Sequence, residues 1–213
     1  MSHVNKEGML VVISGFSGVG KGTAVKKLVE KYDYSLSVSA TTRAPRPGET
    51  DGVDYHFKTV EEFQNLIDYN GFIEWAQYVE NYYGTPKKFV EDELAKGRNV
   101  ILEIEVQGAM HIKEQYPDAV LIFITAPNAE TLKERLEGRG TEEAKVIAKR
   151  LKRAFEETDD MIHYDYFVVN DDLDTCVEDI HSVIQAEGFK SSRNEDYMNS
   201  MKSELSEIRK SYG

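Results

Sequence analysis

Two glycines and a lysine near the start of the chain have the spacing of a phosphate-binding loop. Four residues separate Gly15 from Gly20, and Lys21 follows at once. Glycines let successive backbone N–H groups point at a phosphate, and the lysine reaches the outer phosphates of a nucleoside triphosphate. The pattern therefore predicts a nucleotide site made of nine consecutive residues: Gly15, Phe16, Ser17, Gly18, Val19, Gly20, Lys21, Gly22 and Thr23.

The loop departs from the usual pattern directly after its lysine. A serine or threonine normally stands there and supplies a hydroxyl to Mg²⁺, but this chain has Gly22, with Thr23 next. Two arrangements remain open. Either Thr23 supplies the hydroxyl, or the ion is held mainly by water and nucleotide oxygens, which suits an ion that gives up its water reluctantly.

A second group of cations lies on a loop stiffened by proline. Arg43 and Arg46 are three residues apart, and Pro45 and Pro47 flank the second arginine. Two guanidinium groups on a stiff turn suit a phosphate dianion. Taken alone, the segment is equally typical of two solvated surface arginines.

Charge is distributed unevenly along the chain. The 213 residues include 26 Lys or Arg and 38 Asp or Glu, a balance of −12, which argues against binding to nucleic acid or an anionic membrane. Residues 135–153 nevertheless sum to +4, and residues 154–189 to −11. The basic stretch predicts either a solvated helix face or a grip on polyphosphate. With one cysteine, no apolar run of about 20 residues and a polar N-terminus, a cytoplasmic protein is expected.

These groups must be positioned by alternating strands and helices. Short apolar runs predict buried strands at 9–14, 99–106, 120–125 and 166–170, while 24–32 and 128–139 predict helices, with another helix capped by Thr141. This alternation is typical of a parallel sheet covered on both faces. Residues 39–88 differ, with short strands at 54–57 and 72–79 and a helix capped by Thr59 and Glu62. Residues 190–213 predict a surface helix or a partly disordered tail.

Six further motifs follow the loop in a specific order. They are Asp54-Tyr55-His-Phe, Phe72-Ile-Glu74-Trp-Ala, Asn81-Tyr-Tyr83-Gly-Thr85, Leu102-Glu-Ile-Glu105-Val-Gln-Gly, Arg135-Leu-Glu-Gly-Arg139-Gly-Thr and Val169-Asn170-Asp-Asp-Leu. With the phosphate loop, they make the chain resemble the guanylate kinases over about residues 9–189. The resemblance implies the reaction ATP + GMP ⇌ ADP + GDP with Mg²⁺.

The resemblance also implies an α/β fold, that of the P-loop nucleoside monophosphate kinases. A parallel sheet core flanked by helices would carry an inserted α+β GMP-binding subdomain and a helical lid. The expected divisions are an N-terminal tail at 1–8, a core at 9–38 and 89–189 with the lid at about 135–155, the GMP-binding subdomain at 39–88, and a polar C-terminal extension at 190–213.

Residue roles follow from the same resemblance. Catalysis is assigned to Lys21, Arg43, Arg139 and Arg150, and the loop is joined in ATP binding by Arg135, Arg139 and Asn170. The GMP phosphate is assigned to Arg43, Arg46, Tyr55 and Tyr83, and the guanine to Ser39, Glu74, Thr85 and Glu105, with Glu103 and Arg150 completing the GMP site. The implied partners are ATP, GMP and dGMP; a monomer and a homodimer both remain open.

The chemistry of the bases also supports the assignment of Glu74 to guanine recognition. Guanine presents N1–H and N2–H₂ side by side, so one carboxylate accepts from both, whereas adenine offers neither donor. Adenine would leave the buried charge of this carboxylate unpaired, which supports discrimination against adenine on the order of 10⁴. The alternative interpretation of Glu74 is an acidic side chain on the surface of an edge strand. Two rival functions also remain: a non-catalytic guanylate-kinase-like module that binds a phosphopeptide, and a P-loop kinase for another nucleoside monophosphate.

Overall fold

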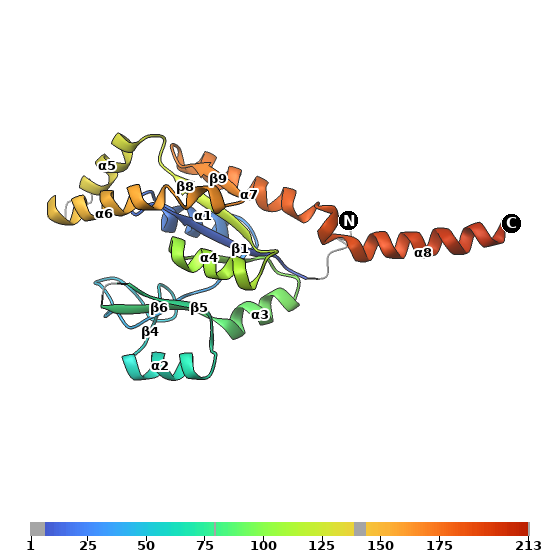
Figure 1. The fold of residues 1–213 in the computed structure, drawn as a ribbon, viewed down its shortest axis with the longest axis horizontal. Helices are drawn as coiled ribbons and strands as arrows, with labels where there is room; N and C mark the ends of the chain where they lie inside the picture. Colours follow the sequence, from blue (N-terminus) through green and yellow to red (C-terminus); the bar gives the residue numbers. More distant parts are fainter. Residues whose placement is uncertain (1–6, 79, 139–143, 213) are drawn as a thin grey trace.

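The computed structural model describes residues 7–78, 80–138 and 144–212. Two sheets and their helices form the molecule, and a long C-terminal helix extends from one end of it (Figure 1). The strands of the main sheet are β1 (Leu10–Gly15), β2 (Ser35–Leu36), β7 (Val100–Glu103), β8 (Val120–Thr125) and β9 (Tyr166–Val169). The helices around it are α1 (Lys21–Lys31), α3 (Lys87–Ala95), α4 (Val106–Gln115), α5 (Ala129–Glu137), α6 (Ala144–Glu157) and α7 (Leu173–Gly188).

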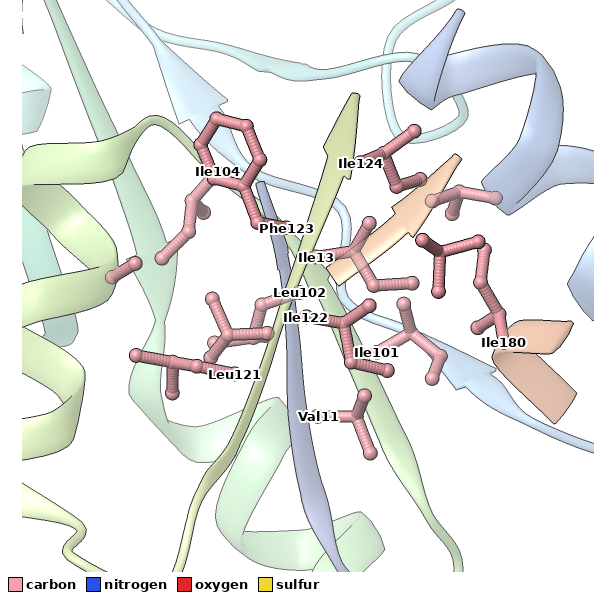
Figure 2. Packing of buried hydrophobic residues seen from close by; sticks show 14 of the residues in the cluster. Val11, Ile13, Ile101, Leu102, Ile104, Leu121, Ile122, Phe123, Ile124 and Ile180 are labelled. Atoms are coloured by element: carbon pink, nitrogen blue, oxygen red, sulfur yellow. The ribbon is translucent and has the colours of Figure 1, made fainter. Parts of the chain in front are cut away.

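The main sheet is parallel throughout and has the order β2-β7-β1-β8-β9. All six residues of β1 are buried, as expected for a central strand with helices on both sides. Ile13, Ile122 and Ile124 lie with Ile180 of α7 on one side of the sheet, and Phe123 points to the other side (Figure 2). The predicted α/β fold is confirmed, with helices on both faces.

Several predicted boundaries differ from the structure at the ends of the strands and helices. The strand expected over 99–106 ends at Glu103, because Val106 already belongs to α4. The helix expected from residue 24 begins at Lys21, with Gly20 before it at a φ of 95°. Thr141, expected to cap the helix that is now α6, lies outside the described residues.

The second sheet is smaller and comes from the segment with the irregular pattern. Its order is β4-β3-β6-β5, and β6 pairs antiparallel with β3 and β5. Phe63 stacks on Phe72 at 4.4 Å between ring centres, in a small core separate from the main one. The predicted capping box of Thr59 and Glu62 opens the helix of this unit. The elements are β3 (Ala40–Thr41), β4 (His56–Phe57), α2 (Val60–Asp68), β5 (Phe72–Tyr78) and β6 (Asn81–Pro86).

Helix α4 connects the two sheets in space, because it contacts both β1 and β5. Two short 3₁₀ turns lie later in the chain: η1 (Met161–His163) is between α6 and β9, and η2 (Ser191–Arg193) follows α7. Beyond η2, helix α8 (Glu195–Ser211) is a surface helix with no buried residue. Of the two expectations for residues 190–213, a helix is therefore the one found over 195–211. No helix in the described ranges is long and apolar enough to cross a membrane.

Candidate active site

The phosphate loop joins β1 to α1 and requires glycine at three points. Gly15, Gly18 and Gly20 have φ values of 151°, 86° and 95°, which side chains rarely adopt. Space is also limiting, because a Cβ at Gly20 would lie 2.7 Å from Nδ2 of Asn170. The loop therefore has the tight backbone that phosphate binding needs, at the amino end of a helix.

Phe16 anchors this loop through its side chain. The ring is 7% exposed and packs edge-on against Phe123 at 4.9 Å between ring centres. The sequence assigned Phe16 to ATP binding as one residue of the loop, and the structure adds this packing role. A buried aromatic ring at the start of the loop fixes the backbone on the core sheet.

Lys21 folds back over the loop. Its Nζ donates to the carbonyl oxygens of Gly15 at 2.6 Å and Phe16 at 3.4 Å, so the cation lies at the mouth of the loop. Glu103, at the end of the neighbouring strand β7, faces the same place. Burial raises the pKa of the Glu103 carboxyl, and the charge of Lys21 acts in the opposite direction. A Cβ at Gly22 would lie 3.5 Å from Oε1 of Glu103.

Arg135 and Asn170 hold the far side of the loop. Nδ2 of Asn170 donates to the carbonyl of Val19 at 2.8 Å, and Nη1 of Arg135 donates to the carbonyl of Asn170 at 2.7 Å. Asn170 is only 6% exposed. Both residues were predicted to bind ATP. Both lie beside the phosphate loop, Asn170 through its hydrogen bond to Val19 and Arg135 through its hydrogen bond to Asn170.

A cavity of about 320 Å³ lies between the loop and the second sheet. Nine of the ten residues predicted to bind GMP line this cavity, and they come from four separate segments. The tenth, Thr85, donates a hydrogen bond to Glu74. Lys21 and Ser17 of the loop line the same cavity. The nine are Ser39, Arg43, Arg46, Tyr55, Glu74, Tyr83, Glu103, Glu105 and Arg150.

Glu74 is a buried carboxylate facing this cavity. It is paired across the antiparallel strands with Thr85, whose Oγ1 donates to Oε1 at 2.7 Å. Burial raises the pKa of the Glu74 carboxyl, while the Thr85 bond lowers it. Gly108 of α4 leaves room for the other oxygen, since a Cβ there would lie 2.8 Å from Oε2. The pairing of the strands and the Thr85 hydroxyl fix the position of the carboxylate, and the absence of a side chain at Gly108 leaves space for it.

Arg43 is held in a fork by a residue that the sequence did not single out. Its Nη1 and Nη2 donate to the two carboxylate oxygens of Glu49 at 3.0 and 2.9 Å, and its guanidinium lies 5.3 Å from the Tyr55 ring. Glu49 also accepts from the backbone N–H of Arg46 at 2.7 Å. The bond to Glu49 raises the pKa of Arg43, which keeps the arginine charged.

Helix α6 supplies the opposite wall with Arg150 and Arg153. Arg153 was not predicted. It lies 3.5 Å from Glu105 and donates through Nε to Glu157 at 2.7 Å. Its spacing of three residues from Arg150, on the same helix face, could have indicated it. Arg139, assigned to both catalysis and ATP binding, lies outside the described residues.

Comparisons with known proteins agree with this arrangement. The family model described as guanylate kinase matches residues 7–187. A guanylate kinase of Caldanaerobacter subterraneus is 50% identical over 194 residues, 91% of this chain and 94% of that protein. One from Streptococcus pneumoniae strain R6 is 52% identical over 184 residues, 85% and 88% of the two chains.

A solved structure gives the same result for the fold. The crystal structure of guanylate kinase from Anaplasma phagocytophilum superposes with a TM-score of 0.75 and 35% identity, covering 90% of this chain and 92% of that chain. Sequence motifs, fold and comparisons converge, and the chain therefore belongs to the guanylate kinase family.

Proposed function

We propose that this protein transfers the γ-phosphate of ATP to GMP, or to dGMP, in the cavity between the phosphate loop and the second sheet. One observation carries the proposal. Lys21, Arg43 and Arg150, from three distant segments, line one cavity together with the buried carboxylate of Glu74. A chain with a net charge of −12 thus concentrates positive charge where two anionic substrates would meet.

Glu74 recognises the guanine in this proposal. Its Oε1 accepts from Thr85, and the other lone pairs of the carboxylate are available for N1–H and N2–H₂ of guanine. These donors stabilise the charged form, which burial alone disfavours. Adenine would leave the buried charge without its partners, so AMP is rejected. Ser39 and Glu105 complete the base site.

Arg43, Arg46, Tyr55 and Tyr83 hold the GMP phosphate. Arg43 is already fixed by Glu49 and the Tyr55 ring, so its guanidinium loses little freedom when the phosphate arrives. The phosphate is ionised and is itself the nucleophile, so no general base is required. Positive charge is needed instead to bring two anions together, and Lys21, Arg43, Arg139 and Arg150 supply it.

The residues around the loop fit a Mg²⁺ ion that is bound mostly through the nucleotide. In residues 7–78, 80–138 and 144–212, no three acidic, histidine or cysteine side chains are grouped as a metal site. Glu103 faces the position of the missing hydroxyl at Gly22, and its carboxylate would hold the ion, with Thr23 as the other candidate. When bound, Mg²⁺ neutralises part of the phosphate charge. Arg135 and Asn170, which lie beside the loop, join it in binding ATP.

Two rival functions are less well supported. A non-catalytic phosphopeptide-binding module has no use for a phosphate loop, yet Lys21 lies at the mouth of an intact one. A kinase for AMP or a pyrimidine monophosphate has no use for a buried carboxylate held by Thr85. The cytoplasmic location and the absence of nucleic-acid and membrane partners stay predictions.

The test is a coupled assay of ADP release with ATP, Mg²⁺ and each nucleoside monophosphate in turn. GMP is expected to stimulate release and AMP to do so at least about 10³-fold less well, by kcat/KM. The variant Glu74→Gln should lose most of this preference and keep its affinity for ATP. No stimulation by GMP, or equal stimulation by AMP, would refute the proposal.

A further inference from the structure

Arg153 links helix α6 to the segment that precedes α4. Its Nε donates to Glu157 of the same helix at 2.7 Å, and its Nη2 lies 3.5 Å from Oε2 of Glu105, the residue just before α4. The proposed phosphoryl transfer gives Arg153 no role, although this side chain lines the cavity together with Arg150. A contact between two segments that both form the cavity can affect how the cavity is assembled.

Arg153 stands where α6 begins to be held by the rest of the protein. None of residues 144–152 is buried, and Ile147 and Leu151 pack on the main core only in part. The buried residues of α6 come after Arg153. Arg150 belongs to the less anchored part, one turn before Arg153 and on the same face of the helix. The direction in which Arg150 points therefore depends on the contacts that Arg153 makes.

Glu157 orients the guanidinium of Arg153. The Glu157 side chain is only 8% exposed, so its carboxylate has a fixed place at the base of α6. Burial raises the pKa of the Glu157 carboxyl, and the hydrogen bond from Arg153 opposes this and favours the charged form. With Nε held by Glu157, the outer nitrogens of the guanidinium extend towards Glu105. The order of contacts is a buried acid, an arginine and an acid of the main body.

We propose that Arg153 is a positioning residue, which orients Arg150 towards the reacting phosphates by holding α6 at Glu105. This inference rests on the proposed phosphoryl transfer, in which Arg150 stabilises the transferring group. Arginine suits the task because its planar fork presents separate donors to two carboxylates at once. The compact ammonium group of a lysine does not span both.

Steady-state kinetics with GMP and ATP varied in turn test the proposal. A misplacement of 1 Å can cost about 10²-fold in rate, so Arg153→Met should lower kcat by about 10- to 100-fold and change both KM values by less than about threefold. Arg153→Lys keeps the charge without the fork and should stay at least about threefold below the wild-type kcat. Lys152→Met is the matched control. It removes the same charge from a side chain that is 79% exposed and pairs with Glu156 at 3.6 Å, and it should keep the wild-type kcat.

A double-mutant cycle tests whether Arg153 acts through Arg150. Arg150→Met alone should lower kcat by about 10³-fold or more. Adding Arg153→Met should lower kcat by less than about threefold further, because the arginine to be oriented is already absent. Two residues with independent roles would give the product of the two separate losses.

A second pair of variants separates orientation from stability. Arg153→Met leaves the buried Glu157 carboxylate without this partner and should lower the melting temperature. Arg153→Met combined with Glu157→Gln removes that charge but does not restore the contact with Glu105. The melting temperature of this double variant should therefore return towards that of wild type, while kcat stays low.

Three results would overturn the inference. The first is a kcat of Arg153→Met within about twofold of wild type. The second is a raised KM for GMP with an unchanged kcat, which would mean that Arg153 binds GMP directly. The third is a multiplicative loss when Arg153→Met is added to Arg150→Met. These results leave the proposed function intact, whereas a wild-type protein that does not phosphorylate GMP would refute both proposals.

Discussion

Replacing Gly108 by alanine should weaken GMP use through Glu74. The added Cβ would lie 2.8 Å from Oε2 of Glu74 and 3.3 Å from its Cδ, whereas ordinary contacts begin near 3.4 Å. The carboxylate oxygen must therefore move by about 0.6 Å, the difference between 3.4 and 2.8 Å. Because Oε1 is bound to Thr85 in a buried site, the movement misaligns the acceptor of the guanine donors.

The size of the effect follows from the size of the shift. A misplacement of 1 Å can cost about 10²-fold in rate, so about 10-fold in kcat/KM for GMP is expected, or about 1.4 kcal/mol. The KM for ATP should be unchanged. The free energy of unfolding should not decrease together with kcat/KM, because alanine is favoured over glycine inside a helix by up to about 1 kcal/mol.

Steady-state kinetics with varied GMP, together with thermal unfolding, measure both quantities. Gly188→Ala is the matched control, since nothing lies within 4 Å of the Cβ it would add at the end of α7. If Gly108→Ala keeps its kcat/KM for GMP within about twofold of wild type, the contact with Glu74 does not limit recognition and the reasoning fails.

Three further outcomes are expected. Arg43→Ala should lower turnover with GMP by about 10³-fold or more and leave ATP binding intact by calorimetry; weaker ATP binding with normal turnover would contradict the assigned role. Glu93 is bound by Ser35, Lys96 and Arg98, with Arg98 the main cause, and its pKa falls from 4.5 to about 2, so its contribution to stability is present above about pH 4.5 and disappears as the pH falls towards 2. Urea unfolding should therefore show Glu93→Gln less stable than wild type at pH 7 and equally stable near pH 2, and a constant difference would count against this assignment. Thr59→Ala removes the cap of α2 and should cost about 1 kcal/mol in the same assay, whereas Thr50→Ala, in an exposed loop, should cost less.

The sequence predicted the main sheet well because its strands are continuous apolar runs. The run at 120–125 matches β8 at both ends, and the phosphate loop lies between β1 and α1 as its glycines required. Strands β2 and β3 were not predicted, since two residues each are too few to show a period.

For the candidate site, the sequence predicted the residues that lie in local motifs and missed those whose role depends on contacts between distant segments. Residues in recognisable motifs, such as Glu74 and Tyr83, lie at the cavity. Glu49 and Gly108 were missed because their importance lies in contacts between segments, with Arg43 and Glu74, and not in local spacing. Arg153 was part of the basic stretch, yet only the fold shows that this side chain, rather than its neighbours Lys149 and Lys152, faces Glu105.

The position of α4 has a consequence for redesigning the enzyme. The second sheet looks like a module that could be exchanged for one that reads another base. The cavity, however, is also lined by Glu103 at the end of β7, Glu105 just before α4 and Gly108 within α4, all of them in the main body. A graft of residues 40–86 alone would carry Glu74 without the glycine that makes room for it. Helix α4 both lines the cavity and packs on the main sheet. A redesign for another acceptor therefore has to change α4 together with the second sheet.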